Sequence, residues 1–144
     1  SMIESSMIIN DRMPEYCAQR AMGALNERKK AMNGAKVLVL GVAYKQDIDD
    51  YRESPALHVI ECLRDLGAEV SYYDPLIPEY THEGKHEQGI PALTADSLSS
   101  ADLVMVTTAH TSVDYDFVAE HAGLVFDTKN AMKNVKKREN IRLL

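Results

Sequence analysis

The stretch Lys36-Val-Leu-Val-Leu-Gly-Val-Ala-Tyr-Lys-Gln-Asp-Ile-Asp-Asp-Tyr-Arg-Glu-Ser-Pro55 decides the fold. It opens with an apolar run that is continuous up to Gly41. A continuous rather than alternating run predicts a strand buried on both faces, as in a parallel sheet. A polar segment follows, and Ser54-Pro55 then begins a helix, with serine as the N-cap and proline in the first helical position. The stretch therefore predicts a strand, a long polar turn and a crossover helix.

The rest of the chain continues this alternation. Further strands are predicted at 69–73, 102–108 and 123–127, with a possible edge strand at 141–144. Short helices are predicted at 94–100 and 114–122. Residues 76–91 form a long charged segment, in which a short helix is one option. Such alternation predicts a Rossmann-like α/β fold with a doubly wound parallel sheet, whose ligands bind beyond the carboxyl ends of the strands.

The residues before the sheet have helical spacing. Pro14 is expected to divide this segment into two helices, because proline begins a helix better than it continues one. Asn33-Gly34 is expected to end the second helix. The sequence therefore predicts a helical part at 1–33 and a sheet domain at 34–144. The methionines and isoleucines of the helical part predict self-association through it.

Composition narrows the class of protein. The chain has 144 residues, of which 45% are hydrophobic and 26% charged, as expected of one globular domain. Its net charge of −6 argues against a general nucleic-acid binder. No apolar run is long enough to span a bilayer, and no secretory signal is visible. Cys17 and Cys62 lack metal-ligand spacing, so we expect them to be reduced in a cytoplasmic protein.

The long turn after the first strand lacks the glycine-rich loop that cradles a dinucleotide, but it carries charged side chains. Lys45 is a candidate to reach a phosphate or a sugar hydroxyl, and Arg52 offers a fork to an anionic oxygen. The alternative is that both cations neutralise Asp47, Asp49 and Asp50 on a solvated loop. A divalent metal on the three aspartates is disfavoured, because the interleaved cations compete for the carboxylates.

A second cation follows the fourth strand, in Asp127-Thr-Lys-Asn130. Lys129 is expected to point into the same crevice as Lys45, and two lysines facing one crevice suit a diphosphate. The alternative is a polar tip that only caps the next segment.

The histidines give weaker signals. His110 follows the third strand and is expected to be a structural residue with its hydrogen bonds satisfied. His82, Glu83 and His86 have spacing that suits a metal on a helix, but without a third ligand we treat them as solvated loop residues. No metal site and no nucleophile are therefore predicted.

The string Gly41-Val-Ala-Tyr-Lys-Gln-Asp-Ile-Asp-Asp-Tyr-Arg-Glu-Ser-Pro-Ala-Leu57 closely resembles the signature of the C-terminal domain of the UDP-glucose/GDP-mannose dehydrogenase family. Supporting matches follow in order at Tyr73-Asp-Pro75, at 101–110 and at 127–130, and residues 9–14 resemble the end of the helical region that joins the two halves. The residues of this string most resemble the bacterial branch of the family that acts on UDP-N-acetylhexosamines. The N-acetylglucosamine enzymes are the first choice and the N-acetylmannosamine enzymes the second.

The resemblance implies one part of a three-part, homodimeric oxidoreductase of polysaccharide biosynthesis. Such enzymes use two NAD to oxidise the sugar C6 alcohol to a carboxylate through a cysteine thioester. Neither Cys17 nor Cys62 has the family's Gly-Gly-Pro-Cys context. The resemblance therefore places the catalytic cysteine and the NAD domain outside this chain, which should be inactive alone.

The resemblance also implies roles for single residues. Tyr44 and Lys45 match the aromatic–lysine pair that contacts the UDP-sugar, and Arg52 matches the arginine that faces the NAD cofactor. Lys129 falls where many members have a substrate-contacting arginine, so it keeps the charge but loses the planar fork. The competing hypothesis is a stand-alone nucleotide-binding or assembly module without catalysis.

Overall fold

The centre of the structure is a five-stranded parallel sheet. The computed structural model describes the backbone of residues 2–144 and the side chains from residue 13 onward. The strands lie in the order β2-β1-β5-β6-β7, and every neighbouring pair is parallel. Their bounds are β1 Lys36–Leu40, β2 Glu69–Tyr73, β5 Leu103–Val106, β6 Val125–Asp127 and β7 Ile141–Leu143. The predicted doubly wound parallel sheet is confirmed.

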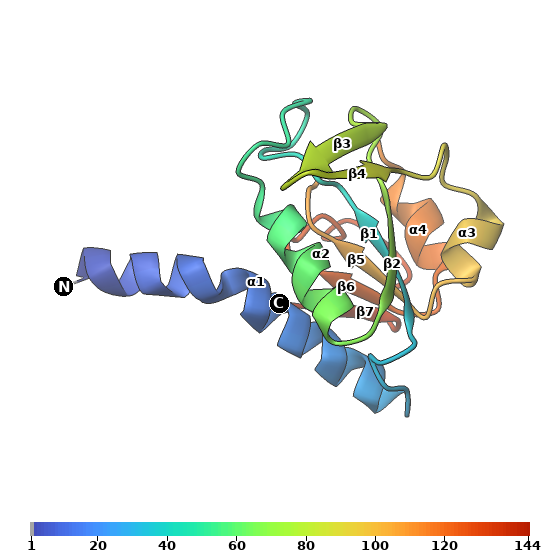
Figure 1. Cartoon of the computed structure of the whole chain (residues 1–144). Helices are drawn as coiled ribbons and strands as arrows, with labels where there is room; N and C mark the ends of the chain where they lie inside the picture. The colour runs from blue at the N-terminus through green and yellow to red at the C-terminus, as the bar shows by residue number, and fades with distance from the viewer. Residues whose placement is uncertain (1) are drawn as a thin grey trace.

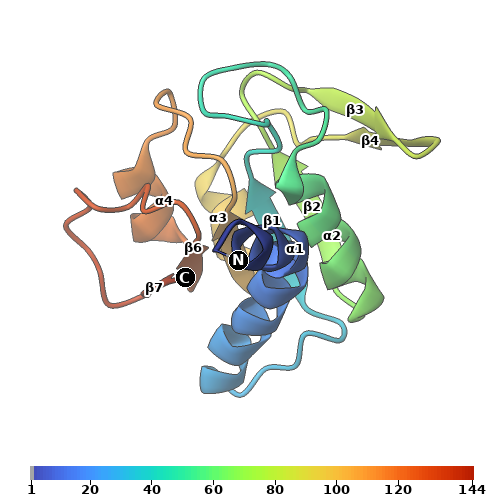
Figure 2. The same cartoon turned by 90° about the vertical axis from the view of Figure 1, so that its left-hand side faces the viewer.

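Helices cover both faces of this sheet (Figures 1 and 2). On one face lie α1 Met2–Glu27 and α2 Pro55–Asp65, and on the other lie α3 Ala95–Ser99 and α4 Tyr115–His121. Alternate residues of β1 divide between the two cores: Val37 and Val39 face α1 and α2, whereas Leu38 and Leu40 face α3 and α4. Burial on both faces explains why the strand sequence is continuously apolar.

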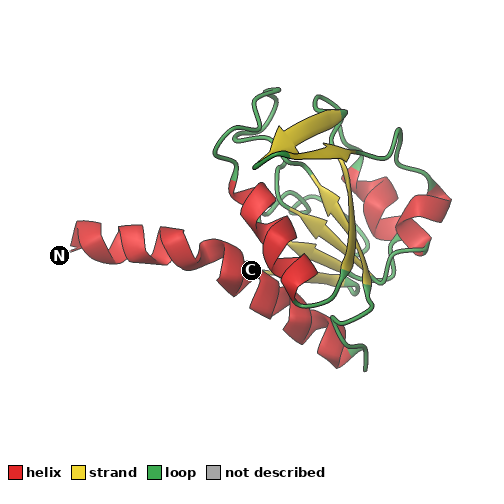
Figure 3. Cartoon of the chain, viewed as in Figure 1, coloured by secondary structure: helices red, strands yellow, loops and turns green. Residues whose placement is uncertain are grey.

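Side-chain caps begin the short helices, and the cap predicted at Ser54 is confirmed. Ser54 accepts a hydrogen bond from the Ala56 N–H, and Pro55 follows it as the first residue of α2. Thr94 and Ser97 form a capping box at α3, and Asp114 caps α4. Figure 3 shows the resulting alternation of helices and strands.

Helix α1 differs from the prediction. It is a single helix with Pro14 inside it, so the predicted division there is wrong. Beyond Pro14, apolar residues from Cys17 to Leu25 are buried against α2 and the sheet, which stabilises the helix despite the missing N–H. The helix ends at Glu27 rather than at Asn33-Gly34, because Lys29 adopts a left-handed φ of 59°. The division of the chain at residue 33 stays a prediction.

The segment after β2 also differs from the prediction. In place of a short helix it forms an antiparallel hairpin of β3 Glu79–His82 and β4 Lys85–Gln88 (Figure 1). Its two-residue turn, Glu83-Gly84, has φ values of 50° and 79°, which match the type I′ turn that suits the twist of a hairpin. Tyr80 is buried in the core beneath it.

Candidate functional site

The loop between β1 and α2 is anchored tightly at both ends. Gly41 has a φ of 93°, and a Cβ there would lie 2.4 Å from the Cβ of Thr108. The Ala43 carbonyl then accepts hydrogen bonds from the hydroxyls of Ser54 and Thr108 at 3.0 and 3.1 Å. The backbone therefore runs close to the end of β5 before the loop opens to solvent at Tyr44.

A buried His110–Asp74 pair supports this loop from below. The His110 Nδ1 accepts from the Asp47 N–H at 2.8 Å, so its Nε2 carries the proton and donates to the Asp74 carboxylate at 2.8 Å. The same carboxylate accepts from the N–H groups of Val42 and Leu76, each at 2.9 Å. His110 is thus a satisfied structural residue, as predicted.

Two of the three loop aspartates, Asp47 and Asp50, have partners other than Lys45. Asp50 holds the Arg52 guanidinium through two hydrogen bonds of 3.0 Å, and these bonds lower the pKa of Asp50. Asp47 accepts from the backbone N–H of Thr111 at 2.8 Å and from its hydroxyl at 3.1 Å. Among the side chains that the structure describes, Lys45 pairs with no carboxylate and lies 5.7 Å from the Tyr44 ring.

The end of β6 positions the second lysine. The Asp127 carboxylate is buried and accepts from the N–H groups of Lys129, Ala131 and Met132 at 3.0, 3.2 and 2.8 Å. This fixes the segment after the strand, as the capping alternative predicts for Asp127. The Lys129 side chain is left at the carboxyl edge of the sheet.

Lys45 and Lys129 line one cleft of about 510 Å³, and Tyr44 lines it with them. Its walls come from α1, the β1–α2 loop, the start of α2 and the strand ends, and comprise Met13, Pro14, Cys17, Ala43, Pro55, Ala56, Val59, Thr107, Thr128 and Leu144. No side-chain carboxylate is among these described lining residues. Arg52 is not among them either, and its side chain is 82% exposed.

The residues that α1 contributes to the cleft were not predicted to belong to the site. Cys17 is the one of these residues whose side chain could act as a nucleophile. Burial raises the pKa of its thiol, and the nearby Lys129 and Arg20 offset this only in part. The thiol is therefore protonated at neutral pH, which makes it a poor nucleophile. No local sequence signal points to Cys17, because its place in the cleft depends on how α1 packs.

A cationic cleft at the carboxyl edge of a doubly wound sheet is typical of Rossmann-like nucleotide-binding domains. The chain belongs to the UDP-glucose/GDP-mannose dehydrogenase family, because residues 38–134 match the family's UDP binding domain. This confirms the resemblance seen in the Gly41–Leu57 string.

Relatives from archaea and bacteria agree with this assignment. UDP-glucose 6-dehydrogenase AglM of Haloferax volcanii is 32% identical over 97% of the chain, and UDP-N-acetyl-D-mannosamine dehydrogenase of Methanococcus maripaludis is 31% identical over 92%. The structure of UDP-D-ManNAc dehydrogenase from Pyrococcus horikoshii matches 94% of the chain with a TM-score of 0.74 and 28% identity. The chain spans only 31% of the length of each of these three proteins.

None of the helices in the described part of the chain combines the length and apolar character that a bilayer crossing requires.

Proposed function

We propose that this chain binds the uridine diphosphate part of a nucleotide sugar in the lysine-lined cleft, with Tyr44, Lys45 and Lys129 as the substrate-binding residues. The observation that carries the proposal is the meeting of the two lysines. They follow different strands, yet they line one cleft of about 510 Å³ without a described side-chain carboxylate in its walls. A diphosphate presents the negative charge that such a cleft attracts.

Three further features support an anionic ligand. Asp50 and Asp47 already bind Arg52 and Thr111, and Lys45 forms no ion pair with a described carboxylate, so Lys45 keeps its charge for a ligand. Helix α2 begins at the cleft, and the positive end of its dipole adds to the two cations. The Tyr44 ring is 51% exposed, which leaves a face free to pack against a base or a sugar.

The full reaction that we propose for the complete enzyme is NAD-dependent oxidation of a UDP-N-acetylhexosamine at C6. The alcohol would lose a hydride to NAD and a proton to solvent, and a cysteine thiolate would add to the resulting aldehyde and take up a proton to give a thiohemiacetal. Loss of a second hydride to another NAD and of a proton would give a thioester, which water would hydrolyse to the uronic acid and the free thiol. The names of the relatives support a UDP-sugar substrate, and several of them act on N-acetylated sugars.

Within this scheme the chain supplies substrate binding and no catalytic residue. The neutral Cys17 thiol supports this assignment. Binding of NAD is assigned mainly to a part of the complete enzyme that lies outside this chain. Arg52 is proposed to face the cofactor, and its exposure outside the lysine cleft is compatible with contact to another domain. Homodimer formation, the cytoplasmic location and the inactivity of the chain alone stay predictions.

Calorimetric titration of the chain with UDP tests the binding site. We expect measurable binding that Lys45→Ala and Lys129→Ala each weaken about tenfold, the low end of what a hydrogen bond to a charged group contributes. Lys36→Ala is the matched control, because this exposed lysine lies at the opposite end of β1. If Lys45→Ala and Lys36→Ala bind UDP equally well, the assigned site is wrong.

A further inference from the structure

A second cluster of chemically active side chains lies between α2 and the β3–β4 hairpin. His58 and Glu61 lie one turn apart on α2, and their side chains are about half exposed. His82 is the last residue of β3 and faces them across the gap. None of the three residues lines the lysine cleft, to which α2 contributes Pro55, Ala56 and Val59.

We propose that His58, Glu61 and His82 bind a divalent transition metal ion of the zinc class. One ligand atom from each residue lies within 4.8 Å of the other two. The His82 Nε2 is 3.1 Å from Glu61 Oε1, and the His58 Nδ1 is 3.7 Å from Glu61 Oε2. Zinc bonds of about 2.0–2.1 Å in a tetrahedron place neighbouring ligand atoms roughly 3.3–3.5 Å apart. The two separations, which involve different oxygens of Glu61, lie on either side of this value, and a shift of the side chains would bring one atom of each residue from within 4.8 Å to that spacing.

The His82 ring nitrogen supplies an independent reason. Its Nε2 has no accessible surface and makes no hydrogen bond with any described residue. Glu61 approaches it at 3.1 Å, but not with the angles of a hydrogen bond. A buried polar atom without a partner calls for a physical explanation. A metal ion between the imidazole and the carboxylate would occupy its lone pair.

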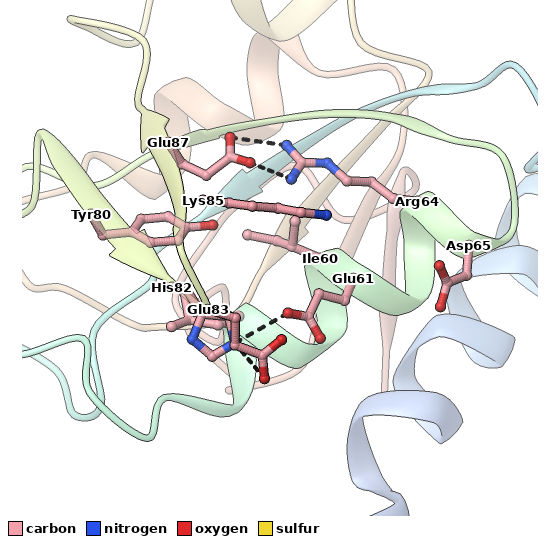
Figure 4. A pocket seen from close by; sticks show the side chains of 10 residues that line it. Ile60, Glu61, Arg64, Asp65, Tyr80, His82, Glu83, Lys85 and Glu87 are labelled. Carbon is pink, nitrogen blue, oxygen red and sulfur yellow. Dashed lines mark hydrogen bonds and ion pairs between the residues drawn. The ribbon is translucent and has the colours of Figure 1, made fainter.

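The surroundings suit a cation. A pocket of about 230 Å³ opens beside Glu61 and His82 (Figure 4). Four carboxylates and two cations line it, and one of the cations, Arg64, is bound to Glu87 at 2.6 and 3.2 Å. Glu83 lies 3.9 Å from the His82 Nε2, which leaves the fourth metal position open to water or to this carboxylate.

The ligand set selects the kind of metal. Two imidazoles and one carboxylate are ligands that zinc takes in proteins, whereas magnesium and calcium prefer oxygen ligands. The bound ion would join α2 to the hairpin, which Arg64 and Glu87 also connect. The site would thus fasten the hairpin to the helix that forms one wall of the lysine cleft.

Calorimetric titration of the EDTA-treated chain with ZnCl₂ tests the site. We expect one saturable site, which His82→Gln and His58→Gln weaken by more than the tenfold to hundredfold that loss of an outer-shell partner costs. His86→Gln is the matched control, because His86 belongs to the same hairpin and lies outside the cluster. MgCl₂ should give no saturable heat.

A second variant keeps the test decisive if a histidine variant unfolds. Glu61→Gln changes a half-exposed helix position, and circular dichroism should show an intact fold while zinc binding is lost. The proposal fails if ZnCl₂ does not bind, or if His86→Gln weakens binding as much as His82→Gln. Neither outcome would affect the UDP site.

Discussion

Removal of the Asp74 carboxylate should destabilise the whole domain. The side chain is fully buried beneath the β1–α2 loop and accepts hydrogen bonds from Val42, Leu76 and His110. Asp74→Ala leaves all three donors without their acceptor. His110 cannot recover by changing tautomer, because its Nδ1 must stay an acceptor for the Asp47 N–H.

The size of the effect follows from the number of hydrogen-bond donors that lose their acceptor. Each buried donor left without a partner costs about 1–3 kcal/mol, and the Val42 and His110 donors are fully buried. Removal of one member of a buried polar pair typically costs about 3–5 kcal/mol. We therefore expect Asp74→Ala to lower the free energy of unfolding by about 4 kcal/mol. For a chain of this size, that lowers Tm by on the order of 10 °C.

Urea unfolding followed by far-ultraviolet circular dichroism measures this change. Asp49→Ala is the control, because Asp49 is an exposed aspartate of the loop that Asp74 supports. We expect the control to stay within about 0.5 kcal/mol of the parent chain. Asp74→Asn should also destabilise the chain. Both carboxylate oxygens accept from N–H groups, and the asparagine NH₂ would replace one of these oxygens with a donor. An Asp74→Ala chain within about 1 kcal/mol of the parent would refute the reasoning.

Two further predictions concern the backbone and pH. Gly41→Ala should cost more than about 2 kcal/mol in urea unfolding, because φ is 93° and the new Cβ would meet a threonine Cβ at 2.4 Å. Gly23→Ala, whose Cβ meets nothing within 4 Å inside α1, should instead stabilise by about 0.5–1 kcal/mol. Hydrogen bonds from the Lys36 N–H and the Lys30 ammonium lower the pKa of Asp102. Its stabilising contribution is therefore present above about pH 4 and lost as the pH falls through the lowered pKa. Acid titrations of Tm should show a smaller loss for Asp102→Asn than for the parent chain.

The sheet could be predicted because each strand carries its own signal. Buried parallel strands read as continuous apolar runs, and the caps at Ser54, Thr94 and Asp114 lie where the helices begin. The two errors have a shared cause. Whether Pro14 breaks a helix depends on the packing of the residues beyond it. Whether 79–88 forms a hairpin depends on a turn of two positive φ values, which Glu83 adopts against its usual preference.

The candidate site could be predicted from the sequence only in part. Lys45 and Lys129 follow strands, and the carboxyl ends of parallel strands share one edge, so their meeting could be expected. That Asp47 and Asp50 bind Thr111 and Arg52 in place of Lys45 could not be expected, since it depends on contacts that only the folded loop makes. The His58–Glu61–His82 cluster also escaped prediction, because helix spacing in the sequence pointed to His86 instead.

The sequence by itself determined the layers of this protein, the alternation of helices and strands in its main sheet and its family, because these depend on local patterns of polarity and on one long signature. Only the tertiary structure decided which charges remain free, which histidines are buried and which distant residues share a site. Those properties depend on contacts between segments far apart in the chain, and each contact is set by the packing of both partners against the sheet.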